Sequence, residues 1–243
     1  MDTLFWKQLH PNIKVEHTKH LLYGKYPYRL VLKCVGTSML RHPDASFEEQ
    51  AEWKRNVNYG GSWKPKLIRR PEPYEFALLH RLRDIRAELL EQDNDSIKTR
   101  IEDPLMQFYT VDEKLLQDLA NKMFTGLDAA NYIQSITMPG SAEDLKLLHQ
   151  GFVLKNNSDY PFRINLRDGR YAESTRESLL KYLDSIGDDV SVPQNTRRQL
   201  ERARGDFVWG GYFYCADENI RIMISMIHPR LIRSVDRYYS QDK

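Results

Sequence analysis

The chain has 243 residues, of which 41% are hydrophobic and 29% are charged, a composition that excludes a disordered, fibrous or integral membrane protein. The 36 Lys and Arg residues against 34 Asp and Glu residues leave a net charge of +2. The total charge therefore does not predict a nucleic-acid partner. Such a prediction depends on where the charges cluster.

The chain carries few signals for targeting, cofactors or metals. No apolar run approaches the roughly 18 residues of a membrane helix, and the first residues lack the pattern of a secretory leader. The two cysteines, Cys34 and Cys215, form neither a disulfide framework nor a zinc site by themselves. We therefore expect a cytoplasmic protein without cofactor or metal.

Two pairs of short segments recur in the same order in both halves of the chain. Residues 26–33 (YPYRLVLK) match residues 160–167 (YPFRINLR), and residues 108–114 (FYTVDEK) match residues 213–219 (FYCADEN). An apolar helical stretch and a strand-like run follow each second segment. We interpret this pattern as an internal duplication, with units over 1–139 and 152–243 joined by a linker helix within 140–151.

In the N-terminal unit, the first strand is predicted over 26–34 and the first helix over about 73–92, with Leu78, Leu82, Ile85 and Leu89 on one stripe. Two strands follow over 97–101 and 106–111. A helix over 112–126 and a strand from Tyr132 complete the unit. The segment at about 40–72 is an insertion that the second unit lacks.

In the C-terminal unit, Phe162, Ile164 and Leu166 alternate with polar residues, the pattern of a half-buried strand. The next segment, 174–186, is predicted as a helix that Ser174 and Glu177 begin as a capping box. A short strand at 190–192, a basic helical stretch, a strand from Gly210, a helix over 217–227 and a last strand from Leu231 follow.

Each unit therefore has the order strand, helix, strand, strand, helix, strand, which is the split βαβ or ferredoxin-like arrangement. We predict an α+β fold of two tandem ferredoxin-like units, with a basic aromatic loop inserted in the first.

The inserted loop is the first candidate for nucleic-acid binding. Its stretch over residues 53–70 interleaves aromatic and basic residues without an acidic one, and such a stretch can stack on unpaired bases while it attracts phosphates. Its candidate residues are Trp53, Lys54, Arg55, Tyr59, Trp63, Lys64, Lys66, Arg69 and Arg70. The alternative is a solvated loop whose tryptophans pack back on the domain.

The second candidate is the segment GGYFYCADENIRIMISMI, which resembles the third strand and second helix of RNA recognition motif domains. The resemblance implies that Tyr212 and Tyr214 form a stacking platform for bases. Strand alternation places both opposite Phe213, and Arg163 and Arg167 of the neighbouring first strand are expected to flank them. The N-terminal unit offers a weaker copy in Arg29, Lys33, Gln107 and Tyr109. Alternatively, the tyrosines cover a sheet packed against the other unit or a partner.

Catalytic patterns are poorer. The histidines lack metal-ligand spacing, and the pairs Asp112-Glu113 and Asp217-Glu218 lie where helices are predicted to begin, which favours helix capping. Arg197, Arg198, Arg202 and Arg204 are typical of an exposed surface helix.

Our leading hypothesis is a non-catalytic binder of single-stranded nucleic acid, with RNA favoured. One alternative is a structural or assembly protein, either a homo-oligomer or a virion component. Another is a metal-independent endoribonuclease, since the enzymes that process CRISPR RNA also have tandem ferredoxin-like domains. His17, His20 or His42 would then act as general acid or base.

Overall fold

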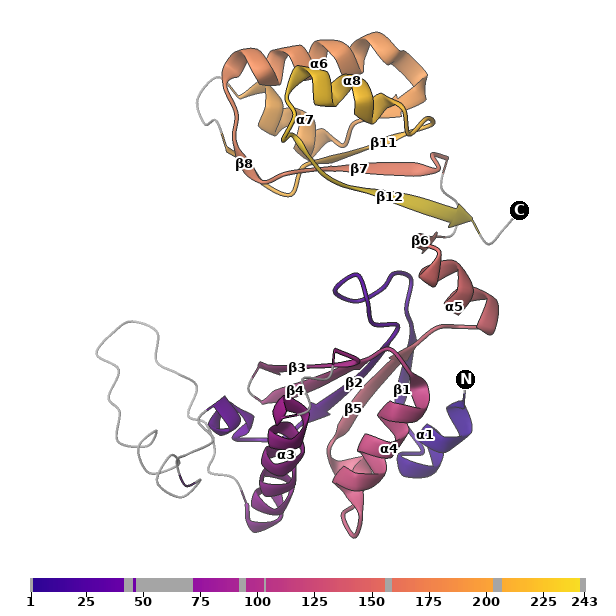
Figure 1. The fold of residues 1–243 in the computed structure, drawn as a ribbon, viewed down its shortest axis with the longest axis vertical. Helices are drawn as coiled ribbons and strands as arrows, with labels where there is room; N and C mark the ends of the chain where they lie inside the picture. The colour runs from indigo at the N-terminus through magenta and orange to yellow at the C-terminus, as the bar shows by residue number, and fades with distance from the viewer. Residues whose placement is uncertain are drawn as a thin grey trace. The chain divides into compact units, whose positions relative to one another are not determined.

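The computed structural model describes residues 2–41, 46, 72–91, 95–102, 104–155, 159–202 and 207–240. The chain has an α+β fold in two compact units, Met1–Leu145 and Lys146–Lys243, each with its own five-stranded mixed sheet (Figure 1). The division falls inside α5 (Ala142–His149), the helix predicted within the linker. Most of the predicted insertion lies outside the described residues. No described helix has the length and apolar character to span a membrane.

The sheet of the first unit has the order β1-β5-β2-β4-β3, in which only β1 and β5 are parallel. Its elements are α1 (Thr3–Leu9), β1 (Lys14–His17), β2 (Tyr28–Lys33), η1 (Thr37–Arg41), α3 (Pro73–Glu91), β3 (Ile97–Glu102), β4 (Leu105–Thr110), α4 (Glu113–Phe124), η2 (Ala129–Asn131) and β5 (Ile133–Met138).

The sheet of the second unit has the matching order β6-β12-β7-β11-β9, again with one parallel pair, β6 and β12. After α5 come β6 (Phe152–Lys155), β7 (Phe162–Leu166), α6 (Glu173–Ile186), η3 (Gly187–Asp189), β9 (Val190–Ser191), α7 (Gln194–Glu201), β11 (Tyr212–Cys215), α8 (Ile220–Ile227) and β12 (Ile232–Ser240). The short strands β8 (Gly169–Arg170) and β10 (Phe207–Val208) pair separately.

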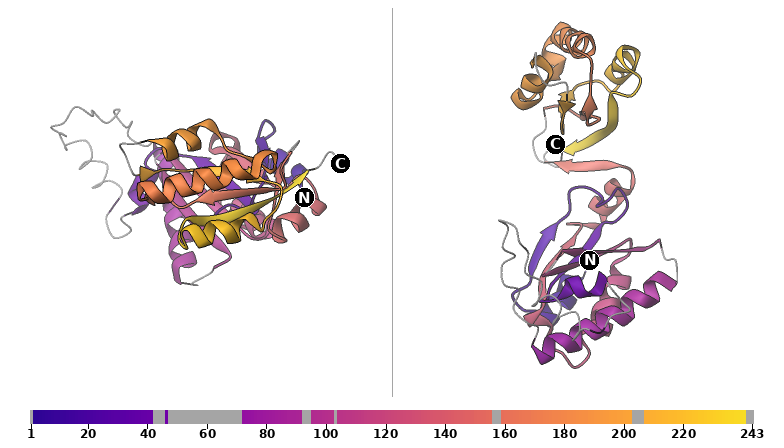
Figure 2. Two further views of the ribbon diagram at one scale, coloured as in Figure 1. Left: turned by 90° about the horizontal axis from the view of Figure 1, so that it is seen from above. Right: turned by 90° about the vertical axis from the view of Figure 1, so that its left-hand side faces the viewer.

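The core of each unit lies between one face of its sheet and the helices. Figure 2 shows α6, α7 and α8 on a single face of the second sheet. Ile164 and Phe213 of that face are fully buried against Leu179, Leu183 and Ile224. In the first unit the equivalent residues, Leu30 and Phe108, pack against leucines of α3 and α4. Because strand residues alternate between faces, the other face of each sheet receives the polar residues.

Each unit also contains, within itself, the same kind of hydrogen bond at a position matched by the sequence repeat. The hydroxyl of Tyr26 donates to the carbonyl of Asp95 at 3.2 Å, and that of Tyr160 donates to the carbonyl of Asp188 at 2.9 Å. Each acceptor lies two residues before an edge strand of its own sheet, β3 or β9.

The last strand of each unit contains the same irregularity. The pairing of β5 with β2 skips Gln134, and the pairing of β12 with β7 skips Arg233. The bulges therefore occupy repeat-matched positions, with a serine next to each. A bulge changes strand twist locally and is a specific feature of a backbone.

Three local expectations differ from the structure. Helix α6 begins at Glu173 after Ala172, which makes no side-chain cap, so the predicted Ser174 capping box is wrong. Helix α8 begins at Ile220 rather than at 217; the Asp217 carboxylate accepts from Asn219 N at 2.9 Å in the turn before it. Strands β1 and β6 were not expected. The prediction that Asp112 caps its helix is confirmed, since its carboxylate accepts from Lys114 N at 3.1 Å.

Replacing Phe213 by alanine tests the position of the second core. Phe213 is 0% exposed, whereas Phe207 in the same unit is 43% exposed. We expect Phe213→Ala to lower the free energy of unfolding of the second unit by about 3–5 kcal/mol, and Phe207→Ala to lower it by less than about 1 kcal/mol. Native-state hydrogen exchange over residues 146–240 measures both values. Equal costs for the two variants would contradict the assigned core.

Candidate functional site

The polar face of the second sheet brings together side chains from four strands. Across the central strands, Tyr214 lies opposite Arg163, and Arg163 lies opposite Asp236. Tyr212 lies opposite Asn165 at the next position on the same face of the sheet. Tyr212 and Tyr214 are half-buried, whereas Phe213 between them is fully buried on the helix side, as alternation predicts.

We call this cluster the tyrosine face. It consists of the aromatic and basic side chains that contact one another on the polar side of the sheet: Lys155, Tyr160, Arg163, Tyr212, Tyr214 and Tyr238.

Two cations lie against the rings of the tyrosine face. The guanidinium carbon of Arg163 is 3.9 Å from the centroid of the Tyr212 ring. The Nζ of Lys155 is 4.6 Å from the Tyr214 centroid and 5.0 Å from that of Tyr238. Such contacts contribute about 0.5–1 kcal/mol each at exposed sites and more where water is excluded. They hold both charges directly above the sheet.

Tyr214 lies at the centre of the aromatic cluster. Its ring centroid is 5.6 Å from that of Tyr212, 6.0 Å from that of Tyr238 and 6.5 Å from that of Tyr160, whose ring is nearly parallel to it at 22°. Tyr160 is itself held by its hydroxyl bond to the carbonyl of Asp188. The rings that surround Tyr214 therefore come from β11, from β12 and from the segment before β7, and the last of these is anchored to η3.

Polar groups lie beside the rings. The side-chain amide of the buried Asn165 donates to Ser234 Oγ at 3.1 Å and to Asp236 Oδ2 at 2.9 Å. Burial raises the pKa of the Tyr238 hydroxyl, against the opposing effect of the neighbouring Arg163, so this tyrosine is neutral at physiological pH. The buried Nε of Arg163 has no hydrogen-bond acceptor in the part of the chain that the structure describes.

Some predicted residues lie elsewhere. Arg167 is one residue beyond the end of β7 and is exposed; its carbonyl accepts from the hydroxyl of Tyr171 at 2.6 Å. We therefore assign Arg163, and not Arg167, to the tyrosine face. The candidate residues of the inserted loop lie outside the described residues: Trp53, Lys54, Arg55, Tyr59, Trp63, Lys64, Lys66, Arg69 and Arg70.

Sequence reasoning missed Lys155, Tyr160 and Tyr238. Two of these had a signal in the sequence. Tyr160 is matched by Tyr26 in the repeat, and Tyr238 has the same parity as Ser234 and Asp236 along the last strand. Lys155 had none, because a short parallel edge strand such as β6 carries no clear alternation.

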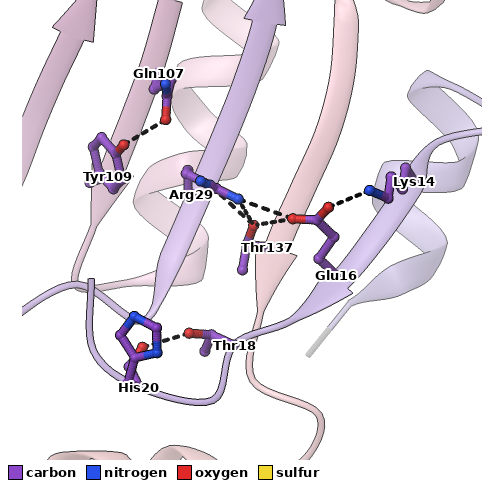
Figure 3. A network of polar contacts seen from close by, with 8 residues as sticks. All are labelled: Lys14, Glu16, Thr18, His20, Arg29, Gln107, Tyr109 and Thr137. Carbon is purple, nitrogen blue, oxygen red and sulfur yellow. Dashed lines mark hydrogen bonds and ion pairs between the residues drawn. The ribbon is translucent and has the colours of Figure 1, made fainter. Parts of the chain in front are cut away.

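In the first unit, the arginine that matches Arg163 is neutralised by neighbouring side chains (Figure 3). The Nη2 of Arg29 donates to Thr137 Oγ1 and to Glu16 Oε2, both at 3.0 Å. Lys14 pairs with the other oxygen of Glu16 at 2.6 Å. The hydrogen bond from Lys14, with smaller help from the Arg29 charge, lowers the pKa of Glu16 against the effect of burial, so the carboxylate stays ionised.

The polar face of the first sheet is also covered by the segment 18–27. Thr18 Oγ1 donates to the carbonyl of His20 at 2.6 Å (Figure 3). Further along the segment, Leu22 and Tyr26 form an isolated antiparallel bridge. At the turn, Tyr23 adopts a left-handed backbone with φ of 53°, which costs a non-glycine residue roughly 1–2 kcal/mol. Its ring meets Tyr109 edge-on, with centroids 4.9 Å apart, and Tyr109 is only 3% exposed.

Of the weaker N-terminal copy, Arg29, Gln107 and Tyr109 are held in internal contacts. The hydroxyl of Tyr109 donates to Gln107 Oε1 at 2.5 Å, within the view of Figure 3. Lys33, at the end of β2, is exposed. The two sheets therefore place similar residues at similar positions but leave only the second unit with half-exposed aromatic rings at the centre of its polar face.

Some of the residues considered for catalysis or metal binding are held in structural contacts, and His42 lies outside the described residues. Glu218 pairs with Arg237 at 2.9 Å and with Arg221 at 3.1 Å. Cys34 and Cys215 are both buried, and no disulfide joins them. Across the described ranges, no three His, Cys, Asp or Glu residues are grouped so that they could hold a metal ion.

Cys215 should be unreactive in the folded chain. Burial, with smaller contributions from Asp217 and Glu218, raises its pKa from 9.0 to about 11. In a Cys34→Ala variant at roughly pH 8, we expect a thiol reagent to label Cys215 at least about 100-fold more slowly than an unstructured cysteine.

The same shift predicts the effect of alkali on stability. The folded pKa lies above the unfolded one, so this contribution to stability is complete below pH 9.0 and is lost as the pH rises towards about 11. In the labelling experiment described above, rapid reaction of Cys215 without denaturant would show that the thiol is not buried.

No protein-family model, curated protein or solved structure matches this chain.

Proposed function

We propose that the second unit binds single-stranded nucleic acid, with RNA favoured, on the tyrosine face and without catalysing a reaction. The observation that carries this proposal is the cluster of Tyr212, Tyr214 and Tyr238 with two cations held against their rings. Phe213, between Tyr212 and Tyr214, is buried in the core on the side of the sheet that α6, α7 and α8 cover (Figure 2), so strand alternation places the cluster on the opposite face. Unpaired bases stack on aromatic and guanidinium planes, and phosphates are attracted to lysine and arginine.

The contacts suggest a role for each side chain. Arg163, stacked on Tyr212, offers a base the outer plane of its guanidinium group. Tyr214 and Tyr238 offer ring faces, and Lys155 lies close to both and can attract a phosphate of the bound strand. The Asp236 carboxylate and Ser234 hydroxyl supply acceptors for base amino groups or for a ribose 2′-hydroxyl.

We propose also that both units are ferredoxin-like and derive from one internal duplication. The strands shared with that arrangement have the same spatial order in both sheets, β5-β2-β4-β3 and β12-β7-β11-β9. The repeat-matched tyrosine hydroxyl bonds and the matched bulges support a common backbone plan. The basic loop with Trp53 and Trp63 stays in the proposal as a predicted clamp over the bound strand, and a cytoplasmic location stays a prediction.

A structural or assembly protein is the second candidate, and one observation favours it. Ile222, Met223 and Met226 of α8 are exposed apolar side chains on one short helix. Grouped exposed apolar residues are typical of contacts between proteins. If a second copy of the chain covers α8, the protein should associate as its concentration rises, and nuclease should have no effect. A nucleic-acid binder should instead copurify with nucleic acid that nuclease removes.

Substitution of single tyrosines tests the binding proposal. We expect Tyr214→Ala to weaken binding of a labelled oligouridine about 10-fold or more, because one stacked base contributes roughly 1–3 kcal/mol. Tyr239→Ala is the matched control, since Tyr239 lies next to Tyr238 on β12 but has the opposite parity and packs against Phe152. Fluorescence anisotropy at low and physiological salt, after nuclease treatment of the protein, gives both affinities.

The wild-type affinity should also fall as salt rises, because phosphate contacts release counterions. Equal affinities for Tyr214→Ala and the wild type would exclude the tyrosine face as the binding site. An absence of binding by the folded wild-type chain at low salt would reject the proposed function.

A further inference from the structure

We propose that Tyr23 occupies a second nucleotide-binding site on the sheet of the first unit, and that displacement of Tyr23 opens this site to single-stranded nucleic acid. This inference rests on the function proposed for the second unit, because it assigns the same ligand to the matching face of the first. It adds a site that the weaker N-terminal pattern alone does not provide.

The groups around Tyr23 are those that a nucleotide requires. Its ring lies edge-on to Tyr109, with centroids 4.9 Å apart. The Nζ of Lys98 is 4.1 Å from the Tyr23 ring centroid, and Arg100 Nη1 donates to the Tyr23 hydroxyl at 3.0 Å. A planar ring is therefore bound by an aromatic neighbour, by a cation over its face and by a guanidinium donor at its oxygen.

The receiving groups belong to the sheet and not to the segment that covers it. Lys98 lies opposite Tyr109 in the pairing of β3 with β4, and Arg100 lies opposite Gln107. Arg100 also pairs with Glu102. Because these side chains stand on two paired strands, they keep their positions when the covering segment moves. A base would replace the Tyr23 ring on Tyr109, and its phosphate would meet Lys98 and Arg100.

Several features make Tyr23 displaceable. Tyr23 is 50% exposed, and its backbone has the unfavourable φ of 53°. The turn around it is closed by the bridge between Leu22 and Tyr26 and by backbone hydrogen bonds from Gly24 N to Leu21 O and from Lys25 N to Leu22 O, all of them local to the segment. Tyr26, in contrast, is anchored to the carbonyl of Asp95, and its position in the repeat is matched by Tyr160.

Tyr23 is also an addition to the plan that the two units share. The repeat aligns Tyr23 with Asn157, so the second unit has no tyrosine at this position of its sequence. The connection from β1 to β2 runs over residues 18–27, whereas that from β6 to β7 runs over 156–161. The longer connection of the first unit carries the aromatic ring that fills its own sheet face.

Substitution of Tyr23 tests the inference. Tyr23→Gly removes the ring and suits the left-handed backbone, and Tyr23→Asn does the same with a residue that tolerates this conformation. Native mass spectrometry then counts the short oligouridine molecules bound to each full-length chain. We expect one for the wild type, one for Tyr23→Phe and two for Tyr23→Gly and Tyr23→Asn. Addition of Tyr109→Ala should remove the second molecule.

The outcomes separate this inference from the proposed function. If the wild type and both ring-removing variants all bind one molecule, the second site is rejected and the function proposed for the tyrosine face stands. If the wild type binds none and Tyr23→Gly binds one that is lost on Tyr109→Ala, the site on the first unit stands and the function proposed for the second unit is rejected. If no folded variant binds, both are rejected.

Discussion

The two-residue period of β7, the strand paired with both β11 and β12, determines the character of the candidate site. Ile164 and Leu166 are drawn into the core beneath the helices, so Arg163 and Asn165 must face the other way. A shift of one residue in the register of β7 would bury Arg163 and expose Ile164, which would strongly destabilise the fold. The same packing that stabilises the second unit therefore sets an arginine at the centre of its polar face.

The neighbouring strands then determine what surrounds this arginine. Their register places Tyr214 on one side of Arg163 and Asp236 on the other, and Tyr212 is close enough for its ring to carry the guanidinium group. In the first unit, the same position holds Arg29, but Thr137 and Glu16 take its hydrogen bonds. The two units thus use one backbone plan for different surface chemistry, with charge neutralised in the first and stacked on aromatic rings in the second.

Much of the fold could be predicted because the signals are local or repeated. The alternation of residues 162–167 predicts β7 and its two faces, and the repeat transfers that prediction to β2. Strands β1 and β6 were not predicted, because they are short edge strands whose parallel pairing with β5 and β12 depends on tertiary structure. The start of α6 was misplaced because Ser174 has the residue type of a cap, although the helix already begins at Glu173.

The candidate site was predicted in part for the same reason. Tyr212, Tyr214 and Arg163 follow from alternation within their own strands. Lys155 and Tyr238 join them only through the pairing of β6 with β12, which brings together residues far apart in the sequence. The contact of Tyr23 with Tyr109 depends on an unusual backbone turn that no residue pattern indicates, because tyrosine is not a residue that favours a positive φ.

The most direct test of the central claim is nuclear magnetic resonance of the full-length chain with isotope-labelled tyrosine rings, titrated with oligouridine. If the second unit binds single strands on the tyrosine face, the ring signals of Tyr212, Tyr214 and Tyr238 shift together as the oligonucleotide is added. Those of Tyr171, buried in the core, and Tyr182, packed against it from α6, stay in place. Shifts confined to tyrosines outside the tyrosine face, or no shifts at all at saturating oligonucleotide, would contradict the account.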